Sequence, residues 1–141
     1  DYIAMLFNGT TWDRTRGNMS NMNLATLVAA TPQSNTPSAD QVNYNGRSLK
    51  VFVDITAISG VGATLVVSIQ AKDPVSSKYV TLLTSAGLIA TGTTVLNIAA
   101  GLLAVANLVV NDVLPRDWRI IYSISGTTPS VTGTIAGAVN V

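Results

Sequence analysis

The stretch that decides the fold class runs from Ser48 to Gln70 and reads SLKVFVDITAISGVGATLVVSIQ. Its first half has apolar residues at 49, 51, 53 and 55, and its second half repeats the alternation at 65, 67 and 69. Apolar residues at every second position are typical of a half-buried β-strand, because successive side chains of a strand point to opposite faces. The segment 59–62 contains two glycines and separates the two runs. The sequence therefore predicts two strands joined as a β-hairpin.

Further strand patterns follow along the rest of the chain. A turn at 73–77 leads to predicted strands at 79–84 and 93–99, and a turn at 126–129 leads from an alternating set at 118–124 to a last strand at 131–141. Residues 100–114 suit either one short helix or an apolar loop. Seven or eight short strands at this spacing predict an all-β domain, either a sandwich or a closed barrel. Of these we expect an antiparallel β-sandwich that is jelly-roll-like.

The first 38 residues differ from the rest, and they predict an extended N-terminal arm over 1–38, followed by a β-sandwich domain over 39–141. An apolar strand candidate at 2–7 ends in Asn8-Gly9, which is a strong turn signal. A second short apolar run follows at 24–30, and residues 31–38 have the composition of a loop. Trp12 lies close to Arg14 and Arg16, and Trp and Arg are enriched at protein–protein hot spots. We therefore expect the arm to bind a neighbouring chain.

The ionisable residues argue against catalysis. The chain has no His, Cys or Glu, which excludes the usual nucleophile–base pairs and thiol chemistry and leaves zinc without its common ligands. Asp112 and Asp117 could on paper serve as the two carboxylates of a glycosidase. A solvated ion-pair cluster of these two residues with Arg116 and Arg119 is the favoured interpretation, because no sequence feature marks either acid as catalytic. The sequence predicts no enzyme, no cofactor and no metal site.

The charge balance limits the classes of partner. Eight Lys and Arg residues face seven Asp residues, and charged residues make up 11% of the chain, against about 25% in ordinary soluble domains. Such a weak positive excess argues against nucleic acid. No charge occurs between Lys78 and Asp112, but polar residues and glycines interrupt every window of the ~20 apolar residues that a membrane span needs. Low net charge promotes association, so we expect a surface that is covered by copies of the chain or by a partner.

Three stretches are familiar in combination. They are FNGTTWDRTRGN at 7–18, NGRSLKV at 45–51 continuing to IQAKDPVSSKY at 69–79, and LPRDWRI at 114–120. Together they resemble the head decoration (cement) proteins of tailed bacteriophages. The resemblance covers most of the chain, and none of the three stretches is a catalytic signature.

This resemblance implies a jelly-roll-like domain on the outer surface of the phage head, bound to the lattice of the major capsid protein and stabilising the mature shell. The expected partners are that protein and further copies of the chain, as a homodimer or homotrimer, without nucleic acid or membrane. Six Trp and Arg residues within the three stretches are the candidate partner-binding residues: Trp12, Arg14, Arg16, Arg47, Arg116 and Trp118.

The alternative is a tail or receptor-binding module that recognises a host surface glycan. Tyr79, Trp118 and Tyr122 are its candidate sugar-binding aromatic residues. Trp118 and Tyr122, however, alternate in phase with Ile120 and Ile124, and this phase favours a position in the core.

Overall fold

The computed structural model describes residues 6–7, 12–13 and 20–140, and it confirms the all-β prediction. β1 (Leu6–Phe7) pairs with β2 (Trp12–Asp13). The other eight strands form one mixed, mostly antiparallel sheet, which is not closed. These strands are β3 (Ser20–Ala30), β4 (Gln33–Pro37), β5 (Gln41–Val42), β6 (Ser48–Lys72), β7 (Tyr79–Thr84), β8 (Gly92–Ile98), β9 (Val109–Val110) and β10 (Asp117–Asn140).

The two longest strands, β6 and β10, organise the sheet. They pair antiparallel along their whole length, from Trp118 opposite Ala71 to Asn140 opposite Ser48. On the other side of β10, β3 pairs with its second half, and β4 and β5 pair with its first half. On the other side of β6, β8 pairs with its first half and β7 with its second half. The short β9 runs parallel to β8 and makes the sheet a mixed one.

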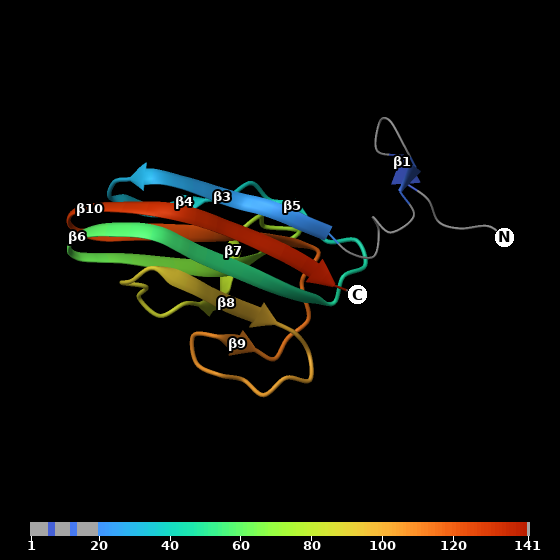
Figure 1. Cartoon of the computed structure of the whole chain (residues 1–141). Coiled ribbons are helices and arrows are strands. Elements are labelled where there is room, and N and C mark those ends of the chain that lie inside the picture. The colour runs from blue at the N-terminus through green and yellow to red at the C-terminus, as the bar shows by residue number, and fades with distance from the viewer. Residues whose placement is uncertain (1–5, 8–11, 14–19, 141) are drawn as a thin grey trace.

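Both long strands bend near their middle, where Gly60 and Gly62 of β6 lie close to Gly126 of β10. All three glycines have positive φ, at 109°, 68° and 124°, and the pairing register shifts on both sides of Thr127. Figure 1 shows each long strand turning at this corner and running back, so that the sheet folds over itself.

The predicted hairpin over 49–70 is therefore wrong. Its two halves belong to the single strand β6, and each half pairs with β10 instead of with the other half. Glycines flanked by alternating apolar runs suit a tight hairpin and a bent strand equally well. Only contacts with β10, which is distant in sequence, separate these two outcomes.

The folded sheet encloses one hydrophobic core. Every second residue in both halves of β6 and β10 faces this core, and a single cluster joins Leu49 and Ile69 of β6 to Ile120 and Ile135 of β10. All four side chains are completely buried. Full burial of such an aliphatic side chain contributes about 1.5–3 kcal/mol to folding. The alternation seen in the sequence is thus the pattern of one core between two halves of the sheet.

Several shorter predictions are confirmed. β7 covers the predicted strand 79–84, and β8 matches the predicted strand 93–99 to within a residue at each end. The turn at 73–77 is present, and the Asp73 carboxylate accepts hydrogen bonds from the N–H groups of Val75 and Ser76, at 2.8 and 3.2 Å. Of the two options for residues 100–114, the structure shows the loop, which contains β9.

Residues 20–37 fall inside the predicted arm 1–38, but they pair with β10 as β3 and β4. The sheet therefore begins before residue 39. Within residues 1–19 the structure describes only β1 and β2, so an extended arm over that part of the chain stays a prediction.

Candidate partner-binding site

The predicted hot-spot residues of the arm lie mostly outside the described residues. Trp12 is placed only by its backbone, which pairs with Phe7. Arg14 and Arg16 belong to the segment 14–19, which the structure does not describe. Their role in partner binding stays a prediction.

Arg47 and Arg116 come from neighbouring segments and are both exposed. The carbonyl of Arg47 accepts a hydrogen bond from the N–H of Leu114 at 3.2 Å, and the carbonyl of Arg116 accepts one from the N–H of Asn43 at 2.6 Å. The Asn43 side chain ties these segments together, because its Nδ2 donates to the carbonyls of Gly46 and Leu114. The structure thus brings two of the six candidates to one end of the domain.

Trp118 does not belong to the surface. Only 1% of it is exposed, and it packs in the core cluster, so it cannot contact a partner or a sugar in this fold. Tyr122 is buried for the same reason, because both side chains face inward from β10. The selection of Trp118 as a partner-binding residue is therefore wrong, and the in-phase alternation that favoured a core position is the correct interpretation.

The expected ion-pair cluster of Asp112, Arg116, Asp117 and Arg119 does not form. In the part of the chain that the structure describes, the one salt bridge joins Lys72 to Asp40. No group of three or more potential metal ligands is found among the described residues.

One surface feature available to a partner is the apolar loop, which we define as residues 99–113 between β8 and β10. It presents five large apolar side chains, of which Leu103 is the most exposed at 87%. The five are Leu102, Leu103, Val105, Leu108 and Val113. In Figure 1 this loop extends beyond β8 at one edge of the sheet, with β9 inside it.

Hydrogen bonds hold the apolar loop in shape. The N–H groups of Asn97 and Ala99 donate to the carbonyls of Leu108 and Val110, and the N–H of Gly101 donates to Oδ1 of Asn111 at 2.8 Å. Nδ2 of Asn107 donates to the carbonyl of Thr84 at the end of β7, at 2.9 Å. The exposed apolar side chains are thus presented by an ordered backbone.

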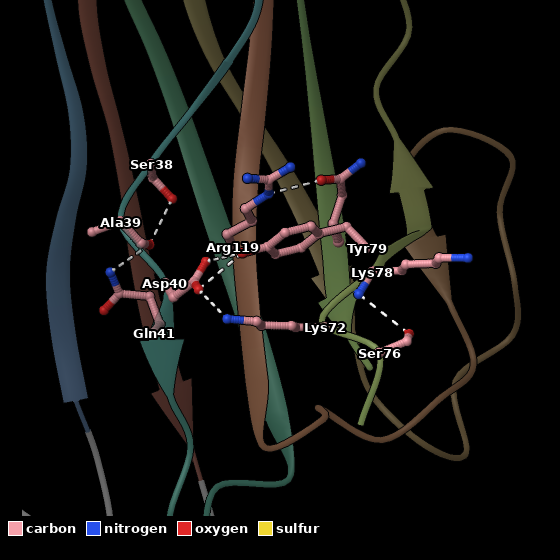
Figure 2. A network of polar contacts seen from close by, with 10 residues as sticks. Ser38, Ala39, Asp40, Gln41, Lys72, Ser76, Lys78, Tyr79 and Arg119 are labelled. Carbon is pink, nitrogen blue, oxygen red and sulfur yellow. Dashed lines mark hydrogen bonds and ion pairs between the residues drawn. The ribbon is translucent and has the colours of Figure 1, made fainter. Parts of the chain in front are cut away.

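A polar cluster, which we call the Tyr79 cluster, lies at the other end of β7 and is drawn in Figure 2. The Tyr79 hydroxyl donates to the Asp40 carboxylate at 2.8 Å, and Lys72 Nζ lies 3.0 Å from the same carboxylate. The Arg119 guanidinium stacks on the Tyr79 ring, with Cζ 3.4 Å from the ring centroid. Arg119 Nε donates to Oε1 of Gln70 at 2.9 Å.

The contacts of the Tyr79 cluster shift two pKa values. Hydrogen bonds from Lys72 and then from Tyr79 lower the pKa of Asp40 below its ordinary value of 3.8. The hydrogen bond to Asp40 and its negative charge raise the pKa of Lys72 above 10.5. Both shifts favour the charged forms, so the pair stays ionised at neutral pH.

A third surface feature is an open depression of about 440 Å³ on the face of the sheet that includes Phe52 and Asn23. Phe52 is 36% exposed, and its cross-strand neighbour on β10 is the small Ala136, which also lies opposite Asn23 on β3. Asn21 lines the same depression. An aromatic ring beside side-chain amides is a combination that could take a polar ligand with an apolar face.

No protein-family model, curated protein or solved structure matches this chain. Within the described residues, no helix is long and apolar enough to cross a membrane. The interpretation of the three surface features therefore depends on their own geometry and chemistry.

Sequence reasoning missed the Tyr79 cluster because its members come from four separate segments. One signal was available: Arg119 alternates with Trp118 and Ile120, so the strand pattern places it on the outer face of β10. The register that sets Arg119 opposite Gln70, and Lys72 opposite Tyr79, depends on long-range pairing. Most of the apolar loop lies within the uncharged run 79–111, but the sequence did not show that its apolar side chains are exposed.

Proposed function

We propose that this chain is a structural protein of a tailed-phage virion, which binds the outer surface of the major capsid protein lattice and stabilises the mature head. The observation that carries the proposal is the apolar loop, in which a hydrogen-bonded backbone presents five exposed apolar side chains and only one charged residue, Asp112. Contiguous exposed apolar surface marks a site of protein–protein contact. The sequence resemblance supplies the identity of the partner.

The fold supports a jelly-roll-like sandwich as the architecture that does this work. On one side of the corner, the neighbouring strands are, in order, β3, the second half of β10, the first half of β6, and β8. On the other side, the order is β4 and β5 at one edge, then the first half of β10, the second half of β6, and β7. A jelly roll is likewise built from two packed β-layers, and this shared feature supports the jelly-roll-like assignment. A decoration protein with such a body would bridge neighbouring capsid subunits.

A decoration protein needs binding surfaces and no catalytic centre. Its binding energy is gained only on the assembled lattice, and it therefore stabilises that lattice by mass action. A stable attachment buries on the order of 1,000 Å² or more, which the apolar loop can share with contacts to further copies of the chain as a dimer or trimer. The predicted arm with Trp12, Arg14 and Arg16 would add a second contact.

The deciding experiment compares phage particles assembled with and without this chain. Decorated shells are expected to retain their DNA at temperatures where bare shells leak it, because each bound copy raises the free energy of opening the lattice. Fluorescence of a DNA-binding dye during heating measures the leakage, and electron microscopy of the same particles locates the protein. Equal leakage from both kinds of particle, or a location at the tail, would reject the decoration role.

The alternative of a tail or receptor-binding module gains one observation, the depression beside Phe52. Aromatic rings stack on the apolar faces of sugars, and amides such as those of Asn21 and Asn23 can bond to hydroxyls. A few copies per virion at the tail, with binding to host glycans that is lost in Phe52→Ala, would favour this alternative. A copy number near that of the major capsid protein would favour the decoration role.

A further inference from the structure

We propose that Arg119 is a preformed receptor for one carboxylate group on the protein to which this chain attaches. This inference rests on the proposed attachment to a protein lattice and names one contact within it. Arg119 was not among the residues that sequence reasoning selected for partner binding. Its environment in the Tyr79 cluster singles it out.

The guanidinium of Arg119 is held on one face and on one edge. Tyr79 covers the face, with Cζ 3.4 Å from the ring centroid, and Gln70 fixes the edge by accepting the Nε–H bond at 2.9 Å. Both supports are themselves fixed, because the Tyr79 hydroxyl bonds to Asp40 and Nε2 of Gln70 donates to Thr81 at 3.3 Å. A guanidinium held in this way has already lost most of the rotamer freedom that binding would otherwise cost.

The opposite edge of the guanidinium is open. Among the residues that the structure describes, none accepts a hydrogen bond from the two Nη atoms of Arg119, and the described salt bridge of this cluster joins Lys72 to Asp40. In Figure 2 the Nη atoms point away from Asp40 and Lys72. With Lys72 and Asp40 neutralising each other, the positive charge of Arg119 is the surplus charge of the cluster.

This arrangement fits a planar carboxylate. Two parallel N–H donors of one guanidinium match the two oxygens of a carboxylate, and such forked pairs are stronger than single neutral hydrogen bonds. A polyanion such as nucleic acid is a poorer match, because Asp40 lies within the cluster and the whole chain carries a net charge of only +1. The occupant is therefore an Asp, a Glu or a terminal carboxylate of a protein.

The position of Arg119 is compatible with the same interface as the apolar loop. The Tyr79 cluster lies at the start of β7, and Asn107 of the apolar loop bonds to Thr84 at its end. Six strand residues span roughly 20 Å. A partner surface of ordinary size, about 800 Å² on each side, reaches over both. The carboxylate would then fix the orientation of a contact whose area is mainly apolar.

The test measures binding of the purified chain to bare phage particles by co-sedimentation. Arg119→Lys keeps the charge and removes the fork, and it is expected to weaken binding about 10-fold or more. Lys78→Ala removes one positive charge from the exposed residue that precedes β7 and serves as the matched control, with binding unchanged. Thermal unfolding of both variants checks that the fold is intact. Equal binding by Arg119→Lys and the wild type, or equal losses in Arg119→Lys and Lys78→Ala, overturns the inference.

A second arm identifies the ligand as a carboxylate. Particles whose carboxylates are amidated with carbodiimide and glycinamide should bind the wild-type chain as weakly as untreated particles bind Arg119→Lys, and amidation should add little to the loss in that variant. Full wild-type affinity for amidated particles, or binding that requires packaged DNA, overturns the inference. If the wild-type chain does not bind untreated particles at all, the proposed function itself fails, and this outcome is distinct from a failure confined to Arg119.

Discussion

Asp40 shows how a single exposed residue can acquire two partners through the fold. Its carboxylate accepts bonds from the Tyr79 hydroxyl and from Lys72, and these contacts lower its pKa. A carboxyl group whose pKa is lower in the folded state stabilises the fold above its unfolded pKa, and this contribution is lost as the pH falls through the folded value. Lys72 has a raised pKa, so its contribution is present below about 10.5 and is lost as the pH rises further.

Asp40→Asn should therefore lower the melting temperature slightly at pH 7, because an exposed pair is screened by water and contributes little. The difference from the wild type should shrink as the pH falls below about 4, since the wild-type carboxylate then also loses its charge. Circular dichroism during heating, from pH 7 down to pH 2, measures both curves. Curves for Asp40→Asn that stay parallel to the wild type at every pH would contradict the assignment.

At this scale the sequence predicted inward-facing residues well and surface contacts poorly. The phase of Trp118 with Ile120 follows from strand geometry alone, so its burial could be read directly. The stacking of Arg119 on Tyr79 joins two strands that both pair with β6. No local sequence pattern predicts the contact between Arg119 and Tyr79, because it depends on the register of two strand pairings.

The corner in β6 and β10 is the element that turns one sheet into two facing halves. Gly126 has φ of +124°, and a Cβ at this position would lie 2.8 Å from the Ala63 nitrogen and the Gly62 carbonyl oxygen. Gly62 has φ of +68°, and a Cβ there would meet nothing within 4 Å. An alanine at position 126 would therefore suffer both an unfavourable φ and steric overlap with backbone atoms. An alanine at position 62 would suffer the unfavourable φ alone.

Gly126→Ala is expected to lower the free energy of unfolding by about 3 kcal/mol, because it adds overlap with backbone atoms to an unfavourable φ. Gly62→Ala at the same corner should cost only about 1 kcal/mol, the ordinary penalty of a left-handed residue. Urea unfolding followed by tryptophan fluorescence measures both. A cost for Gly62→Ala as large as that for Gly126→Ala would show that crowding at the corner is not the cause.

Most strands could be predicted from the sequence, but their pairing could not. The two halves of β6 and of β10 follow the two-residue apolar period closely, and β7 and β8 lie where the sequence predicted strands. The error at 59–62 arose because positive-φ glycines occur in hairpins and in bent strands alike. The partner that both halves of β6 share, β10, is also more than 45 residues away in sequence. β3 and β4 were placed in the arm since Pro32, Pro37 and the polar residues around them resemble a loop, although β10 supplies both with hydrogen-bond partners.

Charged residues are distributed unevenly over the surface of the molecule. The uncharged run between Lys78 and Asp112 contains β7, β8 and all of the apolar loop except Asp112 and Val113, so one edge region of the domain carries little charge. Val28 lies on β3, at the opposite end of the strand order β3-β10-β6-β8-β9, and is 78% exposed. Leu103 and Val28 are thus exposed to a similar extent, but Leu103 lies in the proposed interface and Val28 lies at the other end of the strand order.

Leu103→Ser should weaken attachment to bare phage particles about 10-fold or more, because burying a leucine side chain contributes roughly 1.5–3 kcal/mol. Its melting temperature should match the wild type, since Leu103 is 87% exposed in the isolated chain and surface substitutions of this kind change stability little. Val28→Ser removes a side chain of comparable exposure at the other end of the sheet and should bind as the wild type does. Because the interface is mainly uncharged, the ratio between the two variants should persist at moderate salt, which screens ion pairs but leaves apolar burial intact. Co-sedimentation at two salt concentrations measures this ratio. Equal affinities for both variants would move the attachment surface away from the apolar loop, and a ratio that vanishes with added salt would assign the binding energy to charges instead.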